Sequence, residues 1–199
     1  MDDVTQAKAA ARKAGFAARA AAQKAASPAA AHDLAQHVLA ALAGYAPCRI
    51  SAYLPIRSEI DPRPAMDALH ARGHRLCLPV IQGAGQALRF AAWQPGCALK
   101  DGPFGAAVPA SGAWLAPDIL LCPLVAFDAA FYRLGYGGGF YDRSLQALRA
   151  AKPVLAIGLA YEGQRALALP HDAHDQPLDA VATERAVYWR HLAKPAAAD

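Results

Sequence analysis

The sequence predicts an α/β fold, a single-domain Rossmann-like three-layer sandwich with a mostly parallel sheet and helices on both faces. Its length of 199 residues suits one domain over residues 1–199 with a substantial core. Two apolar runs, residues 118–125 and 154–159, have the length and composition of buried strands. A loop and a helix lie between them, and this βαβ order is typical of a parallel sheet that binds ligands at the carboxyl ends of its strands.

The N-terminal part of the chain favours helices. Alanine-rich residues 4–26 predict one helix. Ser27 followed by Pro28 predicts the start of a second helix, with the serine as N-cap and the proline in the first turn. We expect this helical segment, about residues 1–45, to pack on the sheet.

Strands and helices then alternate along the chain, separated by glycine and proline. The expected elements are, in order, a strand over residues 49–54, a helix over 62–72, strands over 75–80 and 88–93, a long surface loop over 96–112 and a helix over 144–150.

The composition indicates a protein that acts on small molecules. Lys and Arg number 20 against 16 Asp and Glu, and this surplus is spread along the chain, without the clustered basic stripe typical of nucleic-acid binding. The four cysteines form no CxxC pair, and no run approaches the roughly 18 apolar residues of a membrane helix. We expect a cytoplasmic monomer with no nucleic-acid or membrane partner. The basic, alanine-rich N-terminus also suits a transit peptide, against which Asp2 and Asp3 argue.

One run of residues is the strongest functional signal, because it places four glycines between two arginines and includes a carboxylate. The run is Arg133, Leu134, Gly135, Tyr136, Gly137, Gly138, Gly139, Phe140, Tyr141, Asp142 and Arg143. Glycine has no Cβ and adopts positive φ, so successive N–H groups can converge on one anion. The start of the following helix would direct unpaired N–H groups at the same place. The run therefore predicts a phosphate-binding loop.

The two best-known phosphate loops do not match this run. The P-loop pattern GxxxxGK[ST] is absent, and the dinucleotide fingerprint GxGxxG fails at its last position, where Phe140 stands. A glycine-rich connection that binds nothing remains the alternative on composition alone.

Acidic side chains near the run suggest a metal ion. Mg²⁺ prefers one or two carboxylates together with phosphate oxygens and water, and Asp142 and Asp175 could supply those carboxylates. Asp175 belongs to the segment 171–175, which holds two histidines and two aspartates. Zinc is a second hypothesis for that segment, although no cysteine completes a ligand set. An ordinary solvated loop is a third.

Beyond these local signals, four segments in their order and spacing carry a family resemblance over nearly the full chain. They are residues 121–128 (LCPLVAFD), 133–143 (RLGYGGGFYDR), 158–164 (GLAYEGQ) and 174–179 (HDQPLD). Upstream, Lys8 with Arg12, residues 53–55 (YLP) and residues 58–61 (SEID) also fit. On these motifs the chain resembles the 5-formyltetrahydrofolate cyclo-ligase family, also called methenyltetrahydrofolate synthetases.

The resemblance implies a ligase that forms a C–N bond, with ATP as co-substrate and Mg²⁺ as cofactor. It would convert 5-formyltetrahydrofolate to 5,10-methenyltetrahydrofolate, through phosphorylation of the formyl oxygen and attack by N10, and release ADP and phosphate. Its small-molecule substrates would be a reduced folate and ATP. A folate-binding protein without turnover is the alternative, and it could dispense with Asp142. A nicotinamide-dependent oxidoreductase is a further rival, against which the incomplete GxGxxG pattern counts.

The resemblance also implies roles for individual residues. ATP contacts map to Lys8, Arg12, Arg133, Leu134, Gly135, Tyr136, Gly137, Gly138, Gly139, Phe140 and Tyr141. Folate contacts map to Leu54, Glu59, Tyr136 and Phe140, metal ligands to Asp142 and Asp175, and catalytic roles to Arg133, Tyr141 and Asp142.

Two of these assignments have ordinary structural alternatives. Lys8 and Arg12 lie four residues apart and share one helix face, which is also common on a solvated helix surface. Glu59 could equally be an exposed acid in a turn.

The chain departs from the family pattern at two places. Phe131 and Tyr132 stand where the family commonly has a glycine before the arginine, a change expected to reshape the approach to Arg133. Val108 stands before a proline where an acidic residue is common, so a polar contact there is expected to be lost.

Overall fold

The central sheet of the protein is mixed and mostly parallel, as the two apolar runs predict. The computed structural model describes residues 3–190, so residues 1–2 and 191–199 at the ends of the expected domain lie outside the described residues. Eight strands follow the order β12-β11-β10-β7-β1-β2-β3-β6. The neighbours from β11 through β10, β7 and β1 to β2 are parallel, and antiparallel strands complete both edges.

The strands of this sheet are short. They are β1 (Arg49–Ser51), β2 (Arg75–Val80), β3 (Arg89–Trp93), β6 (Trp114–Leu115), β7 (Ile119–Pro123), β10 (Leu155–Leu159), β11 (Ala180–Ala182) and β12 (Val187–Trp189). Two small hairpins lie beside it, β4 (Leu99–Asp101) with β5 (Ala107–Pro109), and β8 (Ala126–Phe127) with β9 (Arg133–Leu134).

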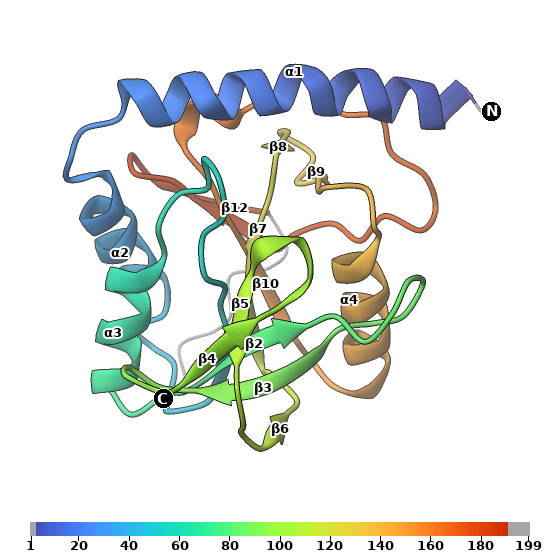
Figure 1. Cartoon of the computed structure of the whole chain (residues 1–199). Coiled ribbons are helices and arrows are strands. Elements are labelled where there is room, and N and C mark those ends of the chain that lie inside the picture. Colours follow the sequence, from blue (N-terminus) through green and yellow to red (C-terminus); the bar gives the residue numbers. More distant parts are fainter. Residues whose placement is uncertain (1–2, 191–199) are drawn as a thin grey trace.

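The helices cover both faces of the sheet and the carboxyl ends of its strands (Figure 1). They are α1 (Asp3–Ala25), α2 (Ala30–Ala41), α3 (Arg63–Ala71) and α4 (Phe140–Ala151), with short 3-10 turns η1 (Pro103–Gly105) and η2 (Glu162–Gln164). Helices α2 and α3 pack together on one side of the sheet, α4 lies on the other, and α1 crosses above the strand ends, in contact with η2, β8 and β9. The predicted α/β fold class is confirmed.

The order of the strands creates a place for a ligand. From β1 the chain continues through α3 to β2, whereas from β7 it continues through α4 to β10 on the opposite side. The crevice beyond the carboxyl ends of β1 and β7 is therefore the point where the strand order reverses, which is where open α/β sheets bind ligands.

Apolar clusters hold the layers together on each side of the sheet. The larger one joins α2 and α3 to the sheet and includes Leu34, Met66 and Ile119. The second places Leu145 of α4 against Leu120. Each fully buried side chain of this size contributes about 1.5–3 kcal/mol. Among the described residues, no helix combines the length and apolar character that crossing a bilayer requires.

Several element boundaries differ from the sequence expectation. The loop expected over residues 96–112 contains the β4–β5 hairpin and η1. The second helix begins at Ala30 with Ala29 as its N-cap, so the predicted N-cap Ser27 was wrong; its Oγ instead accepts a hydrogen bond from N of Ala29 at 3.1 Å in the turn before the helix. Helix α4 begins at Phe140, four residues earlier than expected, which brings Asp142 into its first turn.

Asp118 ties β1 and the end of α4 to the start of β7. Its carboxylate accepts hydrogen bonds from N, Nε and Nη2 of Arg49 at 2.9, 3.0 and 2.9 Å, and from Nζ of Lys152 at 2.5 Å. Burial alone would raise the pKa of Asp118, but the hydrogen bonds from both cations outweigh it and hold that pKa well below its usual range.

This lowered pKa makes the stability of the fold dependent on pH. A carboxyl with a lowered folded pKa stabilises the protein above its ordinary pKa of about 3.9, and this contribution is lost progressively as pH falls toward the folded pKa. We expect Asp118→Asn to lower the free energy of unfolding more at pH 7 than at pH 3, measured by urea denaturation. Asp67→Asn on the exposed side of α3 is the control. An equal loss at both pH values would contradict this role of Asp118.

Candidate active site

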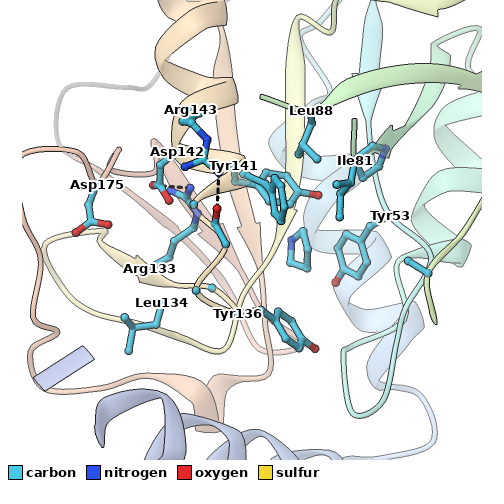
Figure 2. A pocket seen from close by; sticks show the side chains of 18 of the residues that line it. Tyr53, Ile81, Leu88, Arg133, Leu134, Tyr136, Tyr141, Asp142, Arg143 and Asp175 are labelled. Atoms are coloured by element: carbon cyan, nitrogen blue, oxygen red, sulfur yellow. Dashed lines mark hydrogen bonds and ion pairs between the residues drawn. The ribbon is translucent and has the colours of Figure 1, made fainter. Parts of the chain in front are cut away.

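A cavity of about 630 Å³ opens at the carboxyl ends of β1, β2 and β7. Every residue that the sequence analysis assigned to a site lines it, although these residues come from four separate parts of the chain. They are Lys8, Arg12, Leu54, Glu59, Arg133, Leu134, Gly135, Tyr136, Gly137, Gly138, Gly139, Phe140, Tyr141, Asp142 and Asp175. Figure 2 shows Asp142 and Asp175 on one side of the cavity, with Tyr53, Ile81 and Leu88 on the other.

The glycine run forms the loop from β9 into α4. Gly137 has φ +100° and Gly139, the N-cap residue of α4, has φ +63°, a region of backbone space that favours glycine. Nη2 of Arg143 donates to the carbonyl oxygen of Gly138 and so closes the loop onto the helix. The first N–H groups of a helix have no partner within it, and here they belong to the helix that starts directly behind the loop. This geometry suits an anion.

Arg133 is held in place before the loop begins. It is only 8% exposed, and its Nη2 donates to Oδ1 of Asp142 at 2.8 Å. Its Nη1 donates to the carbonyl oxygen of Gln176 at 2.5 Å, and N of Gln176 donates to Oδ1 of Asp142 at 3.1 Å. The guanidinium and the carboxylate therefore have fixed positions on the cavity wall, where an arginine can pair with phosphate oxygens.

Helix α1 brings two further cations to the cavity. Nζ of Lys8 donates to Oδ2 of both Asp172 and Asp175 at 2.6 Å, and Nε of Arg12 donates to the carbonyl oxygen of Gly135 at 3.1 Å. Burial disfavours the charged form of Lys8, but its hydrogen bonds to the two carboxylates outweigh burial and raise its pKa. Lys8 and Arg12 therefore share one face of the helix, and that face is turned toward the site.

The carboxylates on the cavity wall fit a magnesium ion better than zinc. Within residues 3–190, no group of three or more His, Cys, Asp or Glu side chains is arranged to hold a metal, so nothing in the described part supports a zinc cluster. Described residues donate only to Oδ1 of Asp142 and Oδ2 of Asp175, so one oxygen of each carboxylate is available. Such a pair suits Mg²⁺, which takes its other ligands from phosphate and water.

Glu59 is buried at the other end of the cavity, so it is not an exposed acid in a turn. It is 7% exposed, its Oε2 accepts from N of Ile56 at 2.9 Å, and its Oε1 accepts from the hydroxyl of Tyr136 at 3.1 Å. Burial raises the pKa of Glu59, and the positive charge of Arg19 opposes this shift. Leu54 and Ile56 place apolar surface beside the carboxylate.

Tyr141 carries a polar group with no protein partner. Its hydroxyl is shielded from solvent, and no described residue forms a hydrogen bond with it. Burial raises the pKa of Tyr141 well above its ordinary value, so the hydroxyl stays protonated and remains a donor. A buried polar group without a partner costs free energy, and in a cavity wall it indicates a contact that a ligand completes.

The two departures from the family pattern leave the cavity wall intact. Phe131 adopts φ +66°, and Oδ1 of Asp128 accepts from N of Ala130 and N of Tyr132 at 3.0 Å. This turn leads into Arg133, which lies buried beside Asp142. Val108 is buried in β5 and does not line the cavity.

Sequence reasoning missed Arg19 as a residue of this region. Arg19 is 1% exposed, and its Nη2 donates to the hydroxyl of Tyr136 at 2.7 Å. The signal was its spacing, since Arg19 follows Arg12 by seven residues, or two helical turns, on the face that also contains Lys8. A second signal was Gly15 one turn earlier, which lets α1 approach Val125 closely.

Comparison with known proteins identifies the family of this chain. The sequence model of the 5-formyltetrahydrofolate cyclo-ligase family matches residues 4–184. The 5-formyltetrahydrofolate cyclo-ligase of Haemophilus influenzae is 34% identical over 152 residues, covering 73% of this chain and 81% of the relative. That of Escherichia coli strain K12 is 33% identical over 154 residues, covering 70% and 79%.

Solved structures agree as well. The 5,10-methenyltetrahydrofolate synthetase of Aquifex aeolicus, determined by NMR, superposes with a TM-score of 0.70 and 29% identity, over 92% of each chain. The Mycoplasma pneumoniae enzyme of that name superposes with a TM-score of 0.68 and 26% identity, over 89% of this chain and 98% of that one. The chain therefore belongs to the 5-formyltetrahydrofolate cyclo-ligase family.

Proposed function

We propose that this protein closes 5-formyltetrahydrofolate to 5,10-methenyltetrahydrofolate at the described cavity, with ATP as co-substrate and Mg²⁺ as cofactor. The observation that carries the proposal is that the residues assigned to nucleotide, folate and metal from sequence all line one cavity. These residues lie far apart in the sequence, and it is the fold that brings them to the same cavity.

The nucleotide would bind along the glycine loop. Its phosphates would meet the N–H groups of residues 135–139 and the start of α4, where the helix dipole favours negative charge. Lys8, Arg12 and Arg133 would supply positive charge around them. Phosphate oxygens would accept hydrogen bonds from Lys8 and Arg12, either in place of their present partners or together with them. Each cation would therefore stay paired.

The folate would bind across the loop, between Glu59 and the apolar wall formed by Leu54, Ile81 and Leu88. A carboxylate can accept hydrogen bonds from two donors of the pterin side by side. The ring of Tyr136, which is 42% exposed, offers a stacking surface between the two subsites.

The chemistry then needs one activation step and one closure. The formyl oxygen attacks the γ-phosphorus and ADP leaves, so a poor leaving group becomes a phosphate ester. N10 of the same folate attacks the formyl carbon, loses its proton, and expels phosphate together with the former formyl oxygen. The protein contributes position and charge neutralisation, which dominate catalysis of phosphoryl transfer.

Asp142 and Asp175 are the residues that would hold the magnesium ion. When bound, Mg²⁺ neutralises negative charge on phosphate oxygens. The contact of Asp142 with Arg133 at 2.8 Å keeps this carboxylate directed into the cavity.

The proposal is tested with purified protein, ATP, MgCl₂ and 5-formyltetrahydrofolate. The methenyl product is followed by its near-ultraviolet absorbance, and ADP and phosphate are measured in parallel. We expect one ADP per methenyl group and no product when ATP or Mg²⁺ is omitted. Binding of 5-formyltetrahydrofolate without any turnover would instead support the non-catalytic alternative.

Replacing Tyr141 with phenylalanine is expected to raise the stability of the protein and to lower its activity. The change removes a buried hydroxyl that has no protein partner, and such a group costs about 1–3 kcal/mol. A gain of about 1 kcal/mol would raise Tm by about 2–4 °C. Loss of one neutral hydrogen bond to a bound substrate would lower kcat/KM by up to about tenfold.

Tyr45→Phe, the same change on the half-buried Tyr45 away from the cavity, is the control and should leave kcat/KM unchanged. Calorimetry and steady-state kinetics on the same preparations give both quantities. If the Tyr141→Phe protein has parental kinetics and parental Tm, the hydroxyl of Tyr141 has no role in the site.

A further inference from the structure

Arg19 of α1 contacts four residues from three other parts of the chain. Its Nε donates to Oγ of Ser58 at 3.1 Å and its Nη2 donates to the hydroxyl of Tyr136 at 2.7 Å. Its Nη1 lies 3.6 Å from Oε1 of Glu59 and donates to the carbonyl oxygen of Leu124 at 3.4 Å. One side chain of α1 thus contacts the loop after β1, the segment after β7 and the glycine loop.

These contacts connect the two proposed subsites. The hydroxyl of Tyr136 has a single proton, so when it accepts from Arg19 it donates that proton to Oε1 of Glu59 at 3.1 Å. Tyr136 belongs to the glycine loop, whereas Glu59 lies on the loop after β1. Arg19, Tyr136 and Glu59 form one hydrogen-bonded unit, and we call it the Arg19 triad.

The charge of Arg19 also suits this position. A buried carboxylate is stable only when it is paired or hydrogen-bonded, and Arg19 is the cation closest to Glu59, with side-chain exposures of 1% and 4%. A guanidinium has five donors in fixed directions, so it can hold the hydroxyl and the carboxylate at once. A lysine could supply the charge but not this geometry.

We propose that Arg19 is a positioning residue that fixes Tyr136 and Glu59 as one unit, so that nucleotide bound at the glycine loop and reduced folate bound at Glu59 strengthen each other's binding. The proposal rests on the proposed function. Any coupling of this kind is reciprocal, so each ligand raises the affinity for the other by the same factor.

The test measures this factor directly. The dissociation constant of 5-formyltetrahydrofolate is determined by calorimetry with and without the β,γ-imido analogue of ATP and Mg²⁺. For the parent protein we expect the analogue to tighten folate binding by about 5-fold or more. For Arg19→Met the ratio should fall to near one, with KM for folate raised more than kcat is lowered.

Matched variants separate positioning from folding. Lys13→Met removes a cation from the exposed side of the same helix and should keep the parental ratio. Arg19→Lys keeps the positive charge and should keep only part of the parental ratio. Tyr136→Phe removes one hydroxyl and should lower the ratio as Arg19→Met does, while the double variant should lose nothing further. Thermal unfolding establishes that each variant is folded.

Each outcome bears on the proposal. A folded Arg19→Met protein that keeps the parental ratio overturns it. If Arg19→Met does not fold, a parental ratio in Tyr136→Phe overturns it equally. A parent that makes the methenyl product with ATP, but binds folate equally with and without the analogue, refutes the coupling and leaves the proposed function standing. A parent that makes no product with ATP and Mg²⁺ refutes the proposed function itself.

Discussion

Asp142→Asn is expected to lower kcat by about 100-fold or more, the scale seen when one charge-stabilising group of an active site is removed. The carboxylate of Asp142 lies on the cavity wall, paired with Arg133 at 2.8 Å, and one of its oxygens is available to a metal ion. An asparagine amide carries no negative charge and is a weaker ligand for Mg²⁺. The concentration of Mg²⁺ needed for half-maximal rate should rise as well.

The fold should survive this change. The amide oxygen of asparagine can accept the hydrogen bonds that Oδ1 now accepts from Arg133 and from N of Gln176. Circular dichroism and thermal unfolding provide the check, and Asp67→Asn on α3 is the control for the loss of one negative charge. A kcat within about threefold of the parent at saturating Mg²⁺ would exclude Asp142 from the metal site. Even a tenfold change in rate corresponds to only about 1.4 kcal/mol, which is too little for the loss of a metal ligand.

Gly137→Ala should produce the second large effect, a loss of nucleotide affinity. Gly137 has φ +100°, which an alanine adopts only with strain of about 1–3 kcal/mol. Its new Cβ would also lie 3.3 Å from Cζ of Arg12, a cation that faces the same loop. The loop relieves the strain by leaving its binding shape, so the Kd for the β,γ-imido analogue of ATP should rise by about 5-fold to 150-fold.

Gly44→Ala is the matched control, because Gly44 has an ordinary φ and no atom lies within 4 Å of the added Cβ. It should bind the analogue with parental affinity. Isothermal calorimetry on both variants, with 5-formyltetrahydrofolate titrated separately, shows whether the loss is confined to nucleotide. Parental nucleotide affinity in Gly137→Ala would mean that the glycine loop does not bind the phosphates.

Sequence reasoning identified the fold class because the signals for buried parallel strands are local. After Arg75, residues 76–80 are apolar without alternation, and β2 spans Arg75–Val80 as expected. The glycine run could also be predicted from sequence, because positive φ and close approach of the backbone are properties of single glycine residues. The site residues it indicated are brought to one cavity, while their individual roles stay predictions.

What sequence reasoning missed depends on contacts between distant parts of the chain. The start of α4 was misplaced because Phe140, Tyr141 and Asp142 are weak helix formers, yet the helix begins at Phe140, directly after Gly139 in the left-handed conformation. Strands β11 and β12 are three residues each and exist through pairing with β10 and with each other. Arg19 looked like one more basic residue of an alanine-rich helix, because only the folded chain places Glu59 beside it.

The turn before Arg133 has a consequence for finding relatives of this protein. Phe131 occupies a left-handed position that glycine would fill without strain, and the side chain of Asp128 and packing against the second apolar cluster hold it there. A chain can therefore lose the glycine that commonly marks this turn while its arginine keeps its place. A search pattern that demands a glycine before the arginine would miss this chain, whereas a pattern anchored on Asp128 and on the glycine loop would match it.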